Sequence, residues 1–413
     1  MSTDPRGRGS ATRHRDLRTG TPVWPRPRTA LDRPTPLDAN IVTDVVVVGG
    51  GVTGALVTDG LLRAGLRVVV VDRRGWARGS TAASTALLQF DLDQPLIHLG
   101  HKLGRDAAAR AYTRSATAVD YLRGRITDLG LRCGLRERHA VYLPGNVLDA
   151  RGLAAEAKAR DAIGLRARLL DRAGLRALTT IDRPAAIWAA GCAEVDPVAL
   201  TRGLLRSARA RGATLHAPVE IVDVAPGRRH VTLTTASGHE LRARHVVFAT
   251  GYELVKLIRP RGHRITSSWV IATAPQPRRL WPTRCLIWEA ADPYLYIRTA
   301  TDGRVIVGGE DADFADEAHR DALIARKTAT LERKLGALLP ALDPRADLAW
   351  AGSFGDSPTG LPAIGPIPGA RNCHVVMGFG GNGITFAAVA AQYLQRTLTG
   401  LSDPDADLFP VPH

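Results

Sequence analysis

A glycine turn between two valine-rich runs constrains this chain most. The run 44–48 is short, β-branched and apolar on both faces, which favours a strand buried in a parallel sheet. Gly49, Gly51 and Gly54 follow with the spacing GxGxxG, and a helical segment then leads to a second valine run at 68–71. That spacing lets the chain turn tightly, lets the backbone approach a pyrophosphate and lets the helix pack on its strand. The stretch therefore predicts a strand–helix–strand unit that binds a dinucleotide.

The residues around this turn supply the first candidate contacts. Val52 and Thr53 begin the predicted helix, whose N-terminus attracts an anion such as a pyrophosphate. Asp72 ends the second strand, eighteen residues after Gly54, where a carboxylate can accept hydrogen bonds from ribose hydroxyls. Arg73 follows it directly. We count these four residues, with the three glycines, as cofactor-binding candidates.

Three later segments are also rich in glycine and small residues. Residues 79–85 read GSTAAST, and such small residues can line the edge of a flat ring system without a clash. Residues 249–251 read ATG at the end of a predicted strand. Residues 378–386 read GFGGNGITF between a predicted strand and an alanine-rich helix, whose N-terminus would favour negative charge on a bound ring.

These segments together resemble the D-amino-acid oxidase superfamily, the group of flavoproteins that contains glycine oxidase, sarcosine oxidase and the γ-glutamylputrescine oxidoreductases. The resemblance covers about residues 40–400 and implies FAD as the cofactor, with Val219 under the adenine. The cofactor-binding residues that it adds are Ser80, Thr81, Ala83, Ser84, Val219, Thr250, Gly251, Gly360, Gly380, Gly381, Asn382, Gly383, Ile384 and Thr385.

The expected fold class is α/β, with a Rossmann-like FAD-binding domain and a second α+β substrate domain built on an antiparallel sheet. We expect the FAD-binding domain to comprise residues 41–103, 195–261 and 346–400, and the substrate domain to comprise residues 104–194 and 262–345. Residues 1–40 are expected to form an arm, disordered to about Gly20 and extended beyond it, and residues 401–413 a tail.

The resemblance also implies the chemistry. A hydride passes from the carbon that bears an amine to FAD, and water hydrolyses the resulting imine. Amino-acid-oxidising members hold the substrate carboxylate with arginines where this chain has Phe354 and Gly381, and neither side chain pairs with a carboxylate. The substrate is therefore expected to be an amine or an amino-acid-like molecule, with simple amino acids disfavoured.

Three catalytic candidates lie in the predicted substrate domain. Strand alternation places Tyr296 and Arg298 on one face, and Arg298 would bind a carboxylate if that face meets the flavin; the alternative is an exposed arginine. Glu310 falls where sarcosine oxidase-like members have an active-site histidine, so it could bind a substrate ammonium; the alternative is a solvated acid. In the same members a lysine over the flavin helps dioxygen to react, and this chain has Ile306 at that place. The electron acceptor can therefore be dioxygen, or equally a quinone or other molecule. The region 352–358 lacks the cysteine of those members, so we expect non-covalent FAD.

Charge, cysteine content and hydropathy bear on whether the chain binds nucleic acid, binds a metal or spans a membrane. The net charge of +15 comes from 50 Arg and five Lys spread along the chain with no basic run among aromatics, which does not favour nucleic-acid binding. Four scattered cysteines give no metal-ligand spacing and indicate a reduced, cytoplasmic setting. No apolar run approaches the ~20 residues of a membrane span. Two alternatives stay open: a flavoprotein acting on RNA-borne aminomethyl groups, and a non-catalytic flavin-binding subunit of a larger dehydrogenase.

Overall fold

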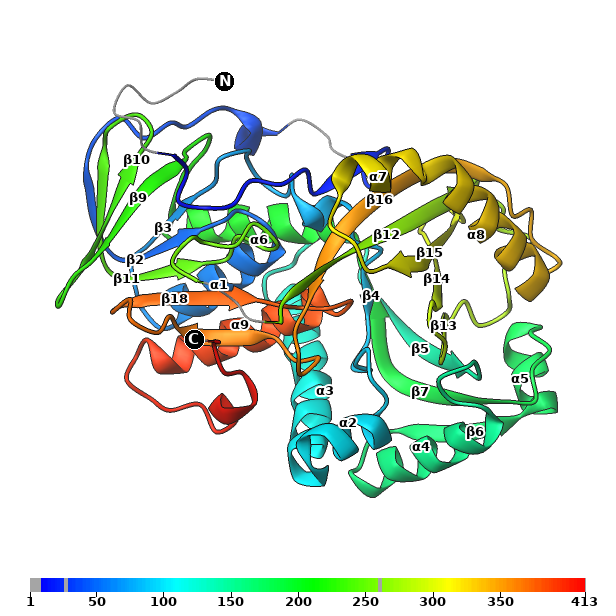
Figure 1. The fold of residues 1–413 in the computed structure, drawn as a ribbon. Helices are drawn as coiled ribbons and strands as arrows, with labels where there is room; N and C mark the ends of the chain where they lie inside the picture. The colour runs from blue at the N-terminus through cyan, green and yellow to red at the C-terminus, as the bar shows by residue number, and fades with distance from the viewer. Residues whose placement is uncertain (1–8, 26–28, 259–261, 413) are drawn as a thin grey trace.

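A computed structural model describes residues 9–25, 29–258 and 262–412 of the chain. Two β-sheets lie next to each other, and the helices pack on and between them (Figure 1). Residues 1–8 of the arm, where we expect disorder, lie outside the described residues.

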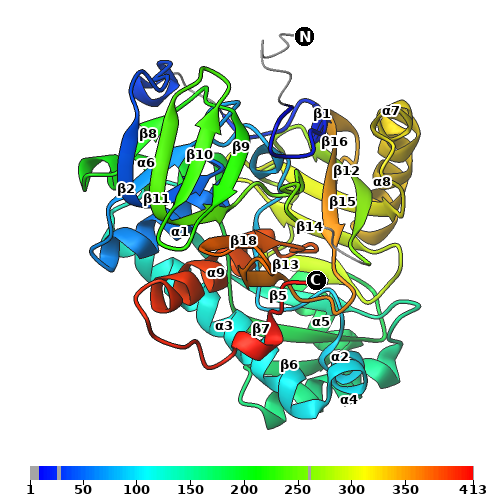
Figure 2. The same cartoon turned by 60° about the vertical axis from the view of Figure 1, so that its left-hand side comes forward.

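The first sheet contains the glycine turn. Val45 to Val48 pair in parallel with Val68 to Val71 on one side and with His245 to Phe248 on the other, so the valine run lies inside the sheet as predicted. Figure 2 shows the antiparallel ribbon next to these strands, formed by residues 221–226, 231–235 and 240–248. In spatial order the strands are β17 (Ala363–Pro366), β18 (Cys373–Met377), β11 (Glu240–Phe248), β2 (Ile41–Val48), β3 (Val68–Val71) and β8 (Thr214–His216), with β10 (Val231–Thr235) on β11 and β9 (Ile221–Pro226) on β10.

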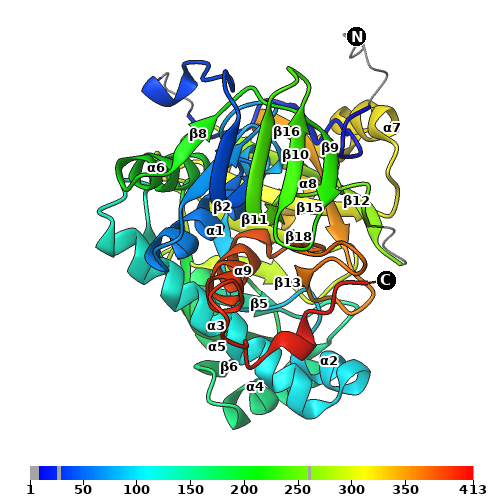
Figure 3. The same cartoon turned by 90° about the vertical axis from the view of Figure 1, so that its left-hand side faces the viewer.

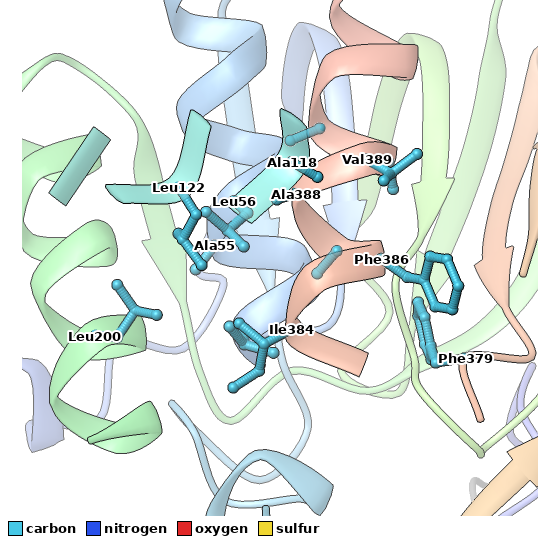
Figure 4. Packing of buried hydrophobic residues seen from close by; sticks show 14 of the residues in the cluster. Ala55, Leu56, Ala118, Leu122, Leu200, Phe379, Ile384, Phe386, Ala388 and Val389 are labelled. Atoms are coloured by element: carbon cyan, nitrogen blue, oxygen red, sulfur yellow. The ribbon is translucent and has the colours of Figure 1, made fainter. Parts of the chain in front are cut away.

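Helices cover one face of this sheet. They are α1 (Val52–Arg63), α6 (Pro197–Ala210) and α9 (Gly383–Thr397), with α3 (Arg105–Asp128) packed behind them (Figure 3). Figure 4 shows Ala55 and Leu56 of α1 close to Leu122 of α3 and Ala388 of α9. Helix α3 is the first part of residues 104–194, which we expected to belong to the substrate domain. It packs on the nucleotide-binding half instead, because its apolar face joins the same core.

The second sheet is mainly antiparallel, as predicted for the substrate domain. Helix α8 (Ile324–Leu338) covers its outer face through buried leucines, and α7 (Glu317–Ala322) precedes it. In order its strands are β1 (Arg18–Gly20), β16 (Ala346–Asp356), β12 (Arg264–Thr273), β15 (Val305–Ala312), β14 (Leu295–Thr299), β13 (Leu286–Glu289), β5 (Arg136–Leu143), β7 (Ala185–Glu194) and β4 (Leu87–Leu88), with β6 (Ala167–Asp171) on β7. The remaining helices in this half are α2 (Leu96–Leu103), α4 (Ala150–Ala162) and α5 (Arg172–Thr179).

Two strands depart from the expected division of the chain. We placed residues 346–400 with the FAD-binding domain, but β16 pairs with β12 along its length and so belongs to the second sheet. Strand β4 likewise pairs with β7, although residues 41–103 were expected to lie with the first sheet. The chain therefore enters and leaves the second sheet at the strand ends that border the cavity described below.

Residues 9–25 of the N-terminal arm pack against both sheets. The backbone N–H of Ala11 donates to the carbonyl of Ile221 (2.9 Å), and β1 pairs antiparallel with β16. Leu17 and Trp24 are buried. The expectation of disorder up to Gly20 is wrong for residues 9–20, because backbone hydrogen bonds to both sheets and buried apolar side chains fix this segment.

Candidate functional site

A cavity joins the two halves of the molecule. Its lining includes Val48, Val71 and Ala249, at the carboxyl ends of β2 and β3 and just after β11, and also Val270 and Tyr296 from the inner face of the second sheet. In open α/β sheets, ligands bind at the carboxyl edge of the strands. The position is therefore that expected for a dinucleotide whose far end reaches a separate domain.

Most predicted cofactor-binding residues converge here from segments far apart in the sequence. Those that line the cavity are Gly49, Gly51, Val52, Thr53, Asp72, Arg73, Ser80, Thr81, Ala83, Ser84, Val219, Thr250, Gly251, Gly380, Gly381, Asn382, Gly383 and Ile384. Their contacts with FAD stay predictions. Gly360 instead lies beside Gln94, and the buried Thr385 hydroxyl donates to the Gln89 carbonyl (3.1 Å), so neither predicted residue reaches the cavity.

The glycine turn has the geometry that its spacing predicts. Gly49 has a φ of 121°, which L side chains rarely adopt. A Cβ on Gly54 would lie 1.8 Å from the carbonyl oxygen of Gly49, so this glycine packs the helix against the turn rather than lining the cavity. Helix α1 begins after Gly51, which as a glycine offers no side-chain cap, and the first turn of the helix borders the cavity. An anionic pyrophosphate fits that end.

The side chain of Asp72 stabilises this turn by hydrogen bonds. Its carboxylate accepts hydrogen bonds from the backbone N–H groups of Gly50 (2.7 Å), Arg74 (2.7 Å) and Gly75 (2.8 Å). Burial raises the pKa of Asp72, although these three donors oppose the shift. The predicted ribose contact would use the remaining lone pairs of a carboxylate that is already fixed in position.

The basic side chains that line the cavity belong to the loop after β3. Arg73 and Arg74 both pair with Glu253, and Arg74 also donates to the carbonyl of Arg15 in the arm (2.9 Å). Arg78 lines the same end. At this nucleotide end of the cavity the guanidinium groups can pair with phosphate, although Asp72, Glu220 and Glu253 also line the cavity and Glu253 already pairs with two of them.

The GSTAAST loop is fastened by aromatic side chains. The indole N–H of Trp24 donates to the carbonyl of Ser84 (2.7 Å), and that of Trp350 donates to the carbonyl of Ala83 (2.9 Å). The hydroxyl of Thr81 accepts from the backbone N–H of Val52 (3.0 Å), which ties this loop to the glycine turn. The loop is thus held rigidly at the cavity edge where the resemblance places the flavin.

The last glycine segment approaches the cavity from the opposite side. Gly380 has a φ of 54°, and α9 begins after Asn382 without a side-chain cap. The backbone N–H of Gly381 donates to Oδ2 of Asp93 (2.8 Å). A Cβ on Gly380 would lie 2.1 Å from the same oxygen, so only glycine allows the loop to sit this close to the carboxylate.

Aromatic side chains form the end of the cavity beneath the second sheet. Trp288, Tyr294, Tyr296 and Phe354 line it, and the hydroxyl of Tyr296 lies 3.3 Å from that of Ser268. Burial raises the pKa of both tyrosine hydroxyls above the ordinary value. Both hydroxyls therefore remain protonated at neutral pH and can form hydrogen bonds without acting as bases.

Arg298 does not face this cavity, and it is not exposed. Its guanidinium is 2% exposed and Nη1 donates to the carbonyls of Thr85 (3.1 Å), Ala86 (2.9 Å) and Val195 (2.8 Å). Burial lowers its pKa to about 10, so it stays charged at neutral pH. Arg298 is neither a carboxylate ligand in the cavity nor an exposed arginine, so both expectations for it are wrong. Its position on the strand lies beyond the cavity, and its guanidinium supports the GSTAAST loop.

Glu310 also points away from the cavity. Its carboxylate pairs with Lys327 and Lys334 of α8 on the outer face of the second sheet. The cause is a β-bulge: Glu310 (φ 59°) and Asp311 together oppose the single residue Ser268 of β12. The extra residue reverses the alternation and turns Asp311, not Glu310, toward the inner face. Glu310 therefore does not lie where the sequence placed it, and its assignment to substrate binding is wrong.

The sequence reasoning missed several lining residues. Asp93 follows the GSTAAST loop, but Gln89, Asp91 and Gln94 lie beside it in the sequence, so no local signal separates Asp93 from its polar neighbours. Ser10, Thr12 and Leu17 of the arm also line the cavity. No sequence signal singled them out, since the arm lacks apolar periodicity.

Two negative findings apply to the part of the chain that the structure describes. No helix there has both the length and the apolar character required to cross a bilayer. No group of three or more His, Cys, Asp or Glu side chains there has the arrangement of a metal site.

Fold and cavity together define a dinucleotide-dependent oxidoreductase with a separate substrate-binding sheet. More narrowly, the chain belongs to the DAO family of FAD-dependent oxidoreductases, which it matches over residues 44–397. This confirms the predicted superfamily, the enzyme class and the two-part α/β fold.

Relatives of known name agree with this family. The chain is 27% identical to the glycine oxidase of Pseudomonas aeruginosa over 380 residues, which cover 86% of this chain and 94% of that protein. It is 22% identical to the gamma-glutamylputrescine oxidoreductase of Escherichia coli over 389 residues, covering 90% and 86%. Its fold matches the crystal structure of glycine oxidase from Geobacillus kaustophilus with a TM-score of 0.73 at 20% identity, covering 90% and 99%.

Proposed function

We propose that this enzyme oxidises a C–N bond of a small amine and holds FAD without a covalent bond. When bound, FAD accepts the hydride that leaves the substrate carbon. The imine product is then hydrolysed by water to a carbonyl compound and an amine. The electron acceptor is dioxygen or a quinone-like molecule, and Ile306, which is buried, adds no charge that would favour either.

The distribution of charge along the cavity is the observation that favours an amine over an amino acid as the substrate. Among the described residues, the basic side chains that line it are Arg73, Arg74 and Arg78, all on the loop after β3 at the nucleotide end. The aromatic end offers Phe354 and Gly381 where amino-acid oxidases of the resembled group have arginines. A substrate carboxylate there would be desolvated without a partner, which costs several kcal/mol.

The residues of the chain would position the reactants as follows. The glycine turn and α1 would take the pyrophosphate, Asp72 the ribose and Val219 the adenine. The N–H groups at the start of α9 would stabilise negative charge on the ring. The aromatic end would exclude water and favour the neutral form of the amine, so that no strong base is needed.

Non-covalent attachment is supported by the positions of the thiols. Cys133, Cys192, Cys285 and Cys373 are buried, and none of them lines the cavity. Denaturation in trichloroacetic acid tests this point, because non-covalent FAD stays in the supernatant and covalent FAD precipitates with the protein.

A single-turnover experiment tests the reaction. The FAD-bound protein is mixed anaerobically with excess primary amine, and the expected result is loss of the yellow absorbance with release of one aldehyde per FAD. Persistent colour with every aliphatic amine would refute the proposal and would favour a non-catalytic flavin-binding role.

A further inference from the structure

Three carboxylates lie together near Tyr294 at the aromatic end of the cavity; Asp93 is exposed, and Asp311 and Asp356 are partly exposed. Asp93 belongs to the loop after β4, Asp311 to the bulge in β15, and Asp356 to the end of β16. Asp93 lines the cavity directly. The three acids thus come from separate segments that fold to one place.

Two of these carboxylates have structural partners. Asp93 accepts from the backbone N–H of Gly381 (2.8 Å), and Oδ2 of Asp356 accepts from the hydroxyl of Thr266 (3.1 Å). Oxygens of both acids lie beside the α-carbon of Gly380, in the loop that precedes α9. Their positions relative to this loop are therefore fixed by the fold.

Asp311 has no such partner. Both of its carboxylate oxygens are almost wholly shielded from solvent, and neither has a partner of good hydrogen-bond geometry among the described residues. The hydroxyls of Ser268 and Tyr294 are its nearest donors, and they favour its charged form. It lies next to Ser268, Tyr294 and Tyr296, whose side chains line the cavity. A shielded carboxylate without a partner of good geometry has free acceptor capacity, which a donor group of a ligand can use.

The charge of Arg264 lowers the pKa of Asp356, but among the described residues no cation pairs directly with any of the three acids. None of the three forms an ion pair there, since the nearby lysines, Lys327 and Lys334, pair with Glu310 on the opposite face. Burial, with repulsion from Asp93 and Asp356, raises the pKa of Asp311 to about 7. Desolvation raises the pKa of Asp93 to about 6 as well. The site therefore contains three acids without an ion-pair partner among the described residues.

We propose that Asp311, with Asp93 and Asp356 around it, binds a protonated amino group of the substrate that is remote from the oxidised C–N bond. The inference rests on the proposed amine oxidation and narrows its substrate class to diamines and polyamines. The nitrogen next to the oxidised carbon must be neutral for hydride transfer, whereas a carboxylate favours the charged ammonium. One molecule satisfies both requirements only if it carries two nitrogens. The remote ammonium keeps its proton and all its bonds during the reaction.

A pair of probes of equal shape and opposite charge tests the site without turnover. The tert-butylammonium ion has no hydrogen on the carbon next to nitrogen and cannot be oxidised, and pivalate is its carboxylate counterpart. Calorimetric titration of the FAD-bound protein at pH 8 is expected to show binding of the cation and none of pivalate. Asp311→Asn should weaken binding of the cation at least about tenfold while FAD content is unchanged.

Glu310→Gln is the matched control. It removes the same charge from the neighbouring residue, which faces α8 instead of the cavity, so the affinity for tert-butylammonium should stay within about twofold. Tighter binding of pivalate than of the cation, no detectable binding of the cation, or equal affinity in the Asp311→Asn protein would overturn the inference. These outcomes concern binding alone, so they are distinct from failure of the enzyme to oxidise any amine.

Discussion

Replacement of Arg298 by methionine separates a supporting role from a substrate-binding role. The guanidinium donates to three buried carbonyls, of Thr85, Ala86 and Val195, at 2.8 to 3.1 Å. Methionine has a similar length but no donor, so these carbonyls lose their partner, at about 1–3 kcal/mol for each group that stays buried. Glu194 lies 3.6 Å from Arg298 and keeps its closer partner Arg138 (2.9 Å).

The expected loss of stability follows from these contacts. After partial relaxation we expect about 3–5 kcal/mol, the range found when one partner of a buried charged network is removed. For a chain of this size, that loss lowers the melting midpoint by roughly 5 °C or more. Differential scanning calorimetry of FAD-bound protein measures it. Because the GSTAAST loop loses its support, the affinity for FAD should fall as well.

An exposed arginine offers the control. Arg172 pairs with Asp182 at the surface, and both side chains are more than half exposed. Arg172→Met should change stability by less than about 1 kcal/mol. If Arg298→Met melted with the parent protein but lost its affinity for substrate, the arginine would be a substrate ligand and its assigned supporting role would be refuted.

Three further predictions address the cofactor site, the acidic site and the arm. Gly54→Ala should cost at least about 2 kcal/mol of FAD affinity, roughly 30-fold, because its Cβ would lie 1.8 Å from the carbonyl oxygen of Gly49; full flavin content in the purified variant would contradict this close packing. The affinity for tert-butylammonium should fall as pH drops below about 7, because protonation removes the charge of Asp311 while the probe stays protonated; a flat profile between pH 5.5 and 8, by calorimetry, would exclude a titrating carboxylate. Deletion of residues 1–20 removes the arm segment that lines the cavity and should speed FAD release several-fold in a stopped-flow competition assay with an excess of an FAD-binding apoprotein; an unchanged rate in a folded variant would show that the arm does not retain the cofactor.

Local sequence rules predicted the cofactor half of the site well. The turn at Gly49, the strand 68–71 and the helix after Asn382 are each set by neighbours within a few residues, through glycine conformation and β-branched runs. The family resemblance added segments that are distant in sequence, such as Thr250 and Gly251. Their meeting at one cavity depends on the parallel pairing of β2, β3 and β11.

The substrate half could not be predicted in the same way. The alternation that assigned Glu310 to the inner face fails at a single inserted residue, and a bulge has no fixed sequence signature. The partners of Arg298 lie about 100 to 210 residues away, so nothing local indicates its burial. The arm packs because both sheets offer it hydrogen-bond partners, which its own composition does not reveal.

The central claim is that the aromatic end of the cavity accepts an amine rather than an amino acid. Anaerobic stopped-flow spectroscopy tests it by comparing reduction of the FAD-bound protein by 1,4-diaminobutane, 1-aminobutane, glycine and sarcosine at equal concentration. The account predicts the fastest loss of flavin absorbance with the diamine, slower loss with the monoamine and none with the amino acids. Faster reduction by glycine or sarcosine than by either amine would contradict it.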